Sequence, residues 1–95
     1  MFTPADLSGL DKPALYDELA AQLGALIEGE RDGIANLANA AALLYHALPA
    51  LNWAGFYLLK DGELVLGPFQ GKIACVRIPV GKGVCGTAVA ENRVQ

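Results

Sequence analysis

The chain has 95 residues, of which 54% are hydrophobic and 18% charged, and its mean hydropathy is +0.35. This composition predicts one small folded domain rather than a disordered chain. The net charge of −3 disfavours a nucleic-acid surface, which needs clustered Lys and Arg. No apolar run reaches the roughly 18 residues of a membrane span, and the acidic N-terminal segment is unlike a signal peptide. We therefore expect a cytosolic protein without membrane attachment.

Two helices are predicted in the first half of the chain. Asp11 is a suitable N-cap for the first, with a proline in the first turn, and Gly29 ends it. Asp32 caps the second, which Pro49 closes. Apolar residues recur at helical spacing and form one expected stripe on each helix: Leu15, Leu19, Leu23 and Leu26 on the first, and Ile34, Leu37, Ala38, Ala41, Leu44, Tyr45 and Leu48 on the second. His46 lies one step off the second stripe, so we expect it at the surface.

The pattern of the second half predicts strands and one further helix. Residues 52–59 are aromatic-rich and suit a mostly buried strand. Asp61-Gly62 is a strong hairpin signal. The segments that follow are interpreted as a strand at 64–66, a loop at 67–71, a strand at 72–80 with Cys75 and Arg77 on one face, and a helix that begins at Gly83.

These elements leave a sheet with an exposed edge and an uncovered face. Complete domains usually cover such an edge. The high apolar content also exceeds what so small a surface needs. We therefore expect the 95 residues to be a piece of a larger α+β domain that is truncated on its C-terminal side.

Two thiols, Cys75 and Cys85, are the candidate reactive groups. In a cytosolic protein they are either buried apolar residues or redox-active thiols, and spacing alone leaves both interpretations open. With His46 as the single histidine, no set of residues has the spacing of zinc ligands.

Residues 81–86, GKGVCG, satisfy the GxGxxG pattern of a dinucleotide-binding turn. That fingerprint needs a parallel strand–turn–helix unit and an acidic residue about 20 positions later, neither of which is expected here. The glycines permit a sharp turn and bring free N–H groups close to a bound group. Cys85, near the helix start, has its thiolate favoured by the helix dipole.

The segments NWAGFYLL (52–59), LVLGPFQGKIACVRIPVGKGVCGTAVA (64–90) and NRVQ (92–95) closely resemble the free methionine-(R)-sulfoxide reductases, which are built on a GAF domain. The match runs from about Ala40 to Gln95. The resemblance implies one GAF-like domain over residues 1–95, with an antiparallel sheet flanked by helices and with the C-terminal strands and helix absent.

The resemblance also implies a reaction. An attacking cysteine, expected beyond residue 95, takes the sulfoxide oxygen as a sulfenic acid, a resolving cysteine converts it to a disulfide, and thioredoxin reduces that disulfide. By motif, Cys75 is the resolving cysteine and Cys85 is an auxiliary resolving or structural thiol. Trp53 and Tyr57, four apart on one strand face, line the substrate pocket. The resemblance implies no metal or organic cofactor. It implies a homodimer.

Two alternatives remain at this point. Periodicity alone favours an ordinary core position for Trp53 and Tyr57 over a place in a pocket wall. A non-enzymatic GAF-type sensor or interaction module would hold a small ligand in the same pocket without needing paired cysteines.

Overall fold

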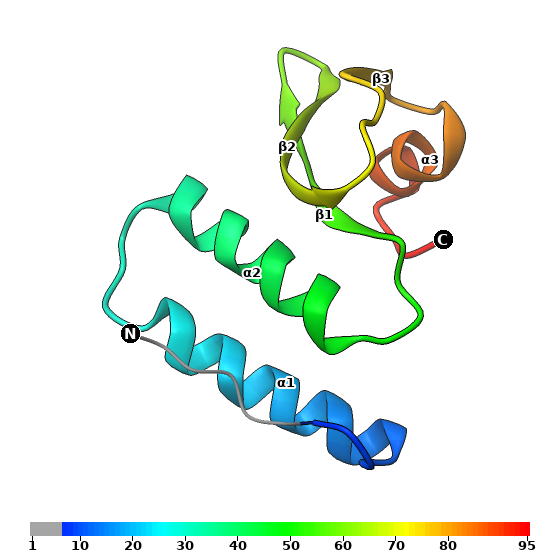
Figure 1. Ribbon diagram of the computed structural model, residues 1–95. Coiled ribbons are helices and arrows are strands. Elements are labelled where there is room, and N and C mark those ends of the chain that lie inside the picture. The colour runs from blue at the N-terminus through cyan, green and yellow to red at the C-terminus, as the bar shows by residue number, and fades with distance from the viewer. Residues whose placement is uncertain (1–6) are drawn as a thin grey trace.

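The computed structural model describes residues 7–95, which form three helices and a three-stranded sheet. In chain order the elements are α1 (Lys12–Ile27), α2 (Gly33–Ala47), β1 (Trp53–Lys60), β2 (Glu63–Gly71), β3 (Arg77–Pro79) and α3 (Gly83–Glu91). Figure 1 shows α1 and α2 as an antiparallel pair, with α2 between α1 and the sheet and α3 beside β3. This is the α+β arrangement that the sequence predicts. No helix within residues 7–95 has both the length and the hydropathy needed to cross a membrane.

Aspartate caps fix where the first two helices begin. The Asp11 carboxylate accepts a hydrogen bond from the Ala14 N–H at 3.0 Å, and the Asp32 carboxylate accepts one from the Ala35 N–H at 2.9 Å. Each bond satisfies an amide that the helix itself leaves without a partner. Both predicted helix starts are confirmed.

The helix α2 buries a wider band than the predicted stripe. It packs against α1 as well as against β1 and β2. Ile34 and Ala38 of the predicted stripe are exposed, whereas Ala40 and Leu43 are buried instead. A single stripe assumes one packed face, but a helix between two layers has two. The leucines of α1, by contrast, are buried or half-buried as predicted, and His46 is exposed as predicted.

The core lies between these layers and is made of alanines and leucines in equal number. The buried apolar residues are Leu19, Ala40, Ala41, Leu43, Ala54 and Leu64. The alanines let α2 approach its neighbours closely, because they present only a methyl group.

The sheet is antiparallel, in the order β1-β2-β3. Asp61 and Gly62 turn the hairpin with φ values of 50° and 81°, as the Asp-Gly signal predicts. The strand β2 continues through residues 67–71, so the predicted loop there is wrong. Gly67 and Pro68 together face one residue of β1, which makes a β-bulge. A bulge tolerates a proline, because the extra residue donates no ladder hydrogen bond.

The third strand is much shorter than predicted. Residues 72–76 form a loop, so the expectation that Cys75 lies on a strand beside Arg77 is wrong. Gly71, with φ of 127°, turns the chain out of β2, and the Leu66 N–H then donates to the Val76 carbonyl at 2.8 Å. The Arg77 guanidinium pairs with the Glu63 carboxylate on β2.

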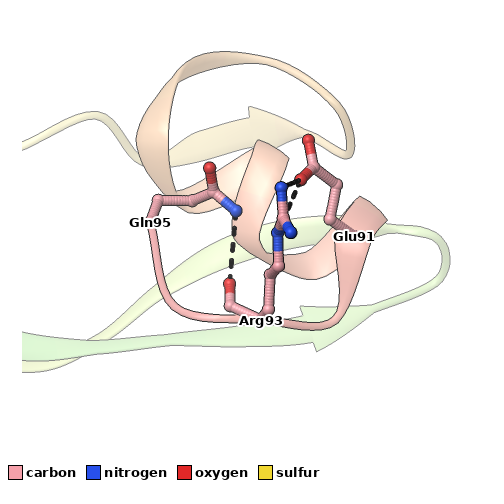
Figure 2. Close-up of polar contacts among 3 residues, drawn as sticks. All are labelled: Glu91, Arg93 and Gln95. Atoms are coloured by element: carbon pink, nitrogen blue, oxygen red, sulfur yellow. Dashed lines mark hydrogen bonds and ion pairs between the residues drawn. The ribbon is translucent and has the colours of Figure 1, made fainter.

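The helix α3 begins at Gly83 as predicted and ends where Asn92 adopts a left-handed conformation with φ of 54°. Beyond it, Arg93 binds the Glu91 carboxylate at 2.9 and 3.0 Å, and the Gln95 amide donates to the Arg93 carbonyl (Figure 2). These groups are exposed, so their ion pair contributes little to stability.

Candidate functional site

An open hollow of about 330 Å³ lies at the sheet. It is lined by side chains from β1, the 72–76 loop, β3 and α3. Its lining is almost entirely apolar. The lining residues are Trp53, Tyr57, Ala74, Cys75, Ile78 and Cys85. The four residues singled out from the sequence therefore come together in one place, although they belong to three separate segments of the chain.

Aromatic rings form the β1 wall of the hollow. The rings of Trp53 and Tyr57 lie 6.2 Å apart between centroids with an interplanar angle of 22°, so the two side chains lie side by side as the strand period predicts. Phe69 on β2 also stacks with Trp53, with ring centroids 5.5 Å apart and an interplanar angle of 15°. Sequence reasoning missed Phe69 because it placed this residue in a loop. The Gly-Pro pair before it is the signal of the bulge that keeps it in the strand.

Two glycines make room for the Trp53 indole. A methyl group on Gly55 would lie 2.8 Å from the Trp53 ring and 2.4 Å from the Phe69 Cβ. One on Gly71 would lie 2.9 Å from the Trp53 Cδ1. The indole thus lies directly against backbone, and its buried Nε1–H has no hydrogen-bond partner within residues 7–95.

The Tyr57 hydroxyl connects the aromatic wall to the thiol loop. It donates a hydrogen bond to the Cys75 carbonyl oxygen at 2.7 Å. Burial raises the pKa of the Tyr57 phenol, and negative charge on Cys75 and Cys85 raises it further. Since a phenol ordinarily titrates near pH 10, Tyr57 stays protonated at neutral pH and remains a donor.

Both thiols are exposed and unpaired. The interpretation of Cys75 and Cys85 as buried apolar residues is therefore wrong. Each borders the hollow, Cys75 from the loop and Cys85 from the first turn of α3. No cluster of three or more His, Cys, Asp or Glu side chains suited to a metal ion occurs in the described part of the chain.

The GKGVCG glycines position α3 against β3. Gly86 is buried, and a methyl group there would lie 2.4 Å from the Pro79 carbonyl oxygen. Gly81 and Gly83 have φ values of 90° and 64°. The N–H groups of Gly81 and Lys82 donate to the carbonyls of Gly86 and Pro79, so the expectation of free N–H groups is wrong at these two positions.

The sheet also lacks the geometry of a dinucleotide site. The β3 strand, which precedes the glycine turn, is antiparallel to β2 rather than part of a parallel unit. The glycines at 81, 83 and 86 therefore serve the turn and the close helix contact, and they bring Cys85 to the hollow.

The three helices and the antiparallel sheet form an α+β fold that is GAF-like. A solved GAF domain superposes with a TM-score of 0.88 at 41% identity, covering 99% of this chain and 59% of that one. A free methionine-R-sulfoxide reductase of Escherichia coli is 63% identical over 86 residues, which are 90% of this chain and 52% of the relative. The solved structure of the Neisseria meningitidis reductase in complex with its substrate gives a TM-score of 0.90 at 48% identity, covering 97% and 55%.

The chain is thus a homologue of the free methionine-R-sulfoxide reductases and corresponds to an N-terminal portion of them. It spans about half the length of the curated relatives it matches. No family model matches the chain.

Proposed function

We propose that this chain supplies the substrate pocket and the resolving thiols of an enzyme that reduces free L-methionine-(R)-sulfoxide to methionine. The observation that carries the proposal is the convergence of two aromatic rings and two exposed thiols on one apolar hollow. Homology to reductases supports it, since one solved relative is a complex with its substrate.

The hollow suits the sulfur end of the substrate. Aromatic rings make favourable contacts with methionine sulfur. They also attract the positively polarised sulfur that forms as the sulfoxide oxygen is lost. In this proposal Trp53 and Tyr57 hold the sulfur and its methyl group beside the thiols.

The proposed reaction divides the chemistry between two cysteines. A cysteine thiolate supplied by a segment beyond residue 95 attacks the sulfoxide sulfur, methionine leaves, and the oxygen stays on the cysteine as a sulfenic acid. The Cys75 thiol then attacks the sulfenic sulfur, which forms a disulfide and releases water. A thioredoxin dithiol reduces this disulfide, and Cys85 is an auxiliary resolving or structural thiol.

The setting of this reaction belongs to the same proposal. The thiols require a reducing compartment, which is the cytoplasm. The β1 and β3 strands are the edges of the sheet, and a homodimer would cover exposed surface of this kind. No metal or organic cofactor takes part in the proposed steps.

A chimera tests the proposal. This chain is joined to the part of the Escherichia coli relative that follows the matched region, and both isomers of methionine sulfoxide are assayed with thioredoxin and its reductase. We expect turnover of the R isomer only, and loss of thioredoxin-linked turnover in Cys75→Ser. A folded chimera that reduces neither isomer would refute the reductase proposal. Binding without turnover would instead support the alternative of a small-ligand sensor.

A further inference from the structure

The Tyr57 hydroxyl reaches from β1 to a backbone carbonyl 18 residues later in the chain. Its bond to the Cys75 carbonyl, at 2.7 Å, has the usual length of a good O–H···O hydrogen bond. The next carbonyl, that of Val76, accepts the Leu66 N–H at 2.8 Å. Two consecutive carbonyls of the loop are therefore tied to the sheet, one by a side chain and one by backbone.

The rest of this loop has little else to hold it. Gly71 pairs with Trp53 at one end, and Val76 is bound at the other. Between these ends Ile73 is 97% exposed and Cys75 is exposed as well. Without the Tyr57 bond, the backbone of residues 72–75 would regain conformational freedom, and the Cys75 side chain would move with it.

We propose that Tyr57 is a positioning residue for Cys75. Its hydroxyl holds the 72–76 loop so that the Cys75 thiol faces the same hollow as the Cys85 thiol. This deepens the proposed function, because it rests on Cys75 as the resolving thiol. A resolving thiol must wait close to the sulfenic acid that it captures, and fixing its loop raises its effective concentration there.

The geometry separates the two parts of the Tyr57 side chain. The ring stacks on Trp53 as part of the aromatic wall, while the hydroxyl serves the loop. Tyr57→Phe keeps the ring and removes only the donor. Tyr16→Phe is the matched control, since it removes the hydroxyl of a tyrosine on α1 that is 54% exposed and lies outside the hollow.

The test uses a short bifunctional alkylating reagent that joins two thiols. Intact mass separates chains bridged between Cys75 and Cys85 from chains with two separate adducts. We expect bridging in the parent and in Tyr16→Phe. In Tyr57→Phe the ratio of bridged to unbridged chains should be lower by roughly fivefold, the effect expected of one net hydrogen bond. An unchanged fraction in Tyr57→Phe would overturn the proposal, as would a parent chain that does not bridge.

A measurement on the parent chain keeps the proposal testable if Tyr57→Phe fails to fold. The NMR order parameter of the Cys75 amide should approach that of rigid backbone, about 0.85, and a value below about 0.6 would overturn the proposal. Neither assay contains methionine sulfoxide. A failed chimera therefore leaves the bridging result standing, and a failed bridging result leaves the reductase proposal to be judged by turnover.

Discussion

Residues 12–71, the scaffold region, and residues 72–95, the thiol region, differ in how much apolar side chain they bury. The scaffold region contains every buried apolar side chain of the described core. In the thiol region Gly86 is the one buried residue. Large apolar side chains are exposed there: Ile73 at 97%, Val94 at 95%, Val84 at 71%, Val76 at 63% and Val80 at 40%.

This difference separates the buried core of the fold from the part that carries both thiols. Burial of apolar surface is the main source of folding free energy, so the scaffold region should supply most of it. Both cysteines lie in the thiol region, Cys75 in the loop that the Tyr57 hydroxyl binds and Cys85 in α3. Catalytic loops on a rigid support follow the same division.

The largest expected effect is a core truncation in the scaffold region. Leu43 is 7% exposed, and Leu43→Ala should lower the free energy of unfolding by about 2–5 kcal/mol, because it leaves a cavity. Ile73→Ala in the thiol region should change it by less than about 0.5 kcal/mol. Urea unfolding followed by circular dichroism measures both. Equal losses from the two variants would remove the distinction between the regions.

A pair of helical glycines sharpens the comparison at the point where α3 meets β3. Gly86→Ala places a methyl group 2.4 Å from the Pro79 carbonyl oxygen, and this overpacking should cost about 1–3 kcal/mol. Gly24 in α1 has nothing within 4 Å of an added Cβ, so Gly24→Ala should gain about 0.5–1 kcal/mol from helix propensity. Thermal unfolding of both variants decides the matter, and a Gly86→Ala gain would contradict the close contact.

The smallest effect concerns a polar defect inside the scaffold region. Gln22 is 7% exposed, and neither polar atom of its side-chain amide has a hydrogen-bond partner among residues 7–95. Gln22→Met keeps the shape and removes the unsatisfied groups, so it should raise the free energy of unfolding by about 1 kcal/mol. Gln22→Glu, which buries a charge instead, should lower it. The denaturant midpoint of each variant shows whether its stability rises or falls. A stability loss in Gln22→Met would mean that the amide has hydrogen-bond partners in solution.

Features set by near neighbours in the chain were predictable from the sequence. Asp11 and Asp32 cap their helices through bonds to amides three residues on, and Asp61-Gly62 turns the hairpin with its own φ values. The trace through residues 67–76 was not predictable. The bulge at Gly67-Pro68 depends on the register of β2 against β1. The 72–76 loop depends on the hydrogen bond that the Leu66 N–H donates to the Val76 carbonyl.

The candidate site divides in the same way. Period-two alternation places Trp53 and Tyr57 together, and motif resemblance singles out Cys75 and Cys85. Sequence patterns did not show that Phe69 stacks on Trp53, or that Gly55 and Gly71 make room for the Trp53 indole. Each of these contacts depends on a close approach between strands.

By itself the sequence determined the three helices, the hairpin turn and the four residues around which a reductase pocket is proposed. Those features follow from local patterns, namely capping residues, residue spacing and short motifs. Only the tertiary structure decided that the loop of Cys75 is tied by the Tyr57 hydroxyl and that Gly86 seats the helix of Cys85 against β3. The reason is physical: a hydrogen bond or a steric contact between segments far apart in the chain depends on how the layers pack, and no local pattern encodes that packing.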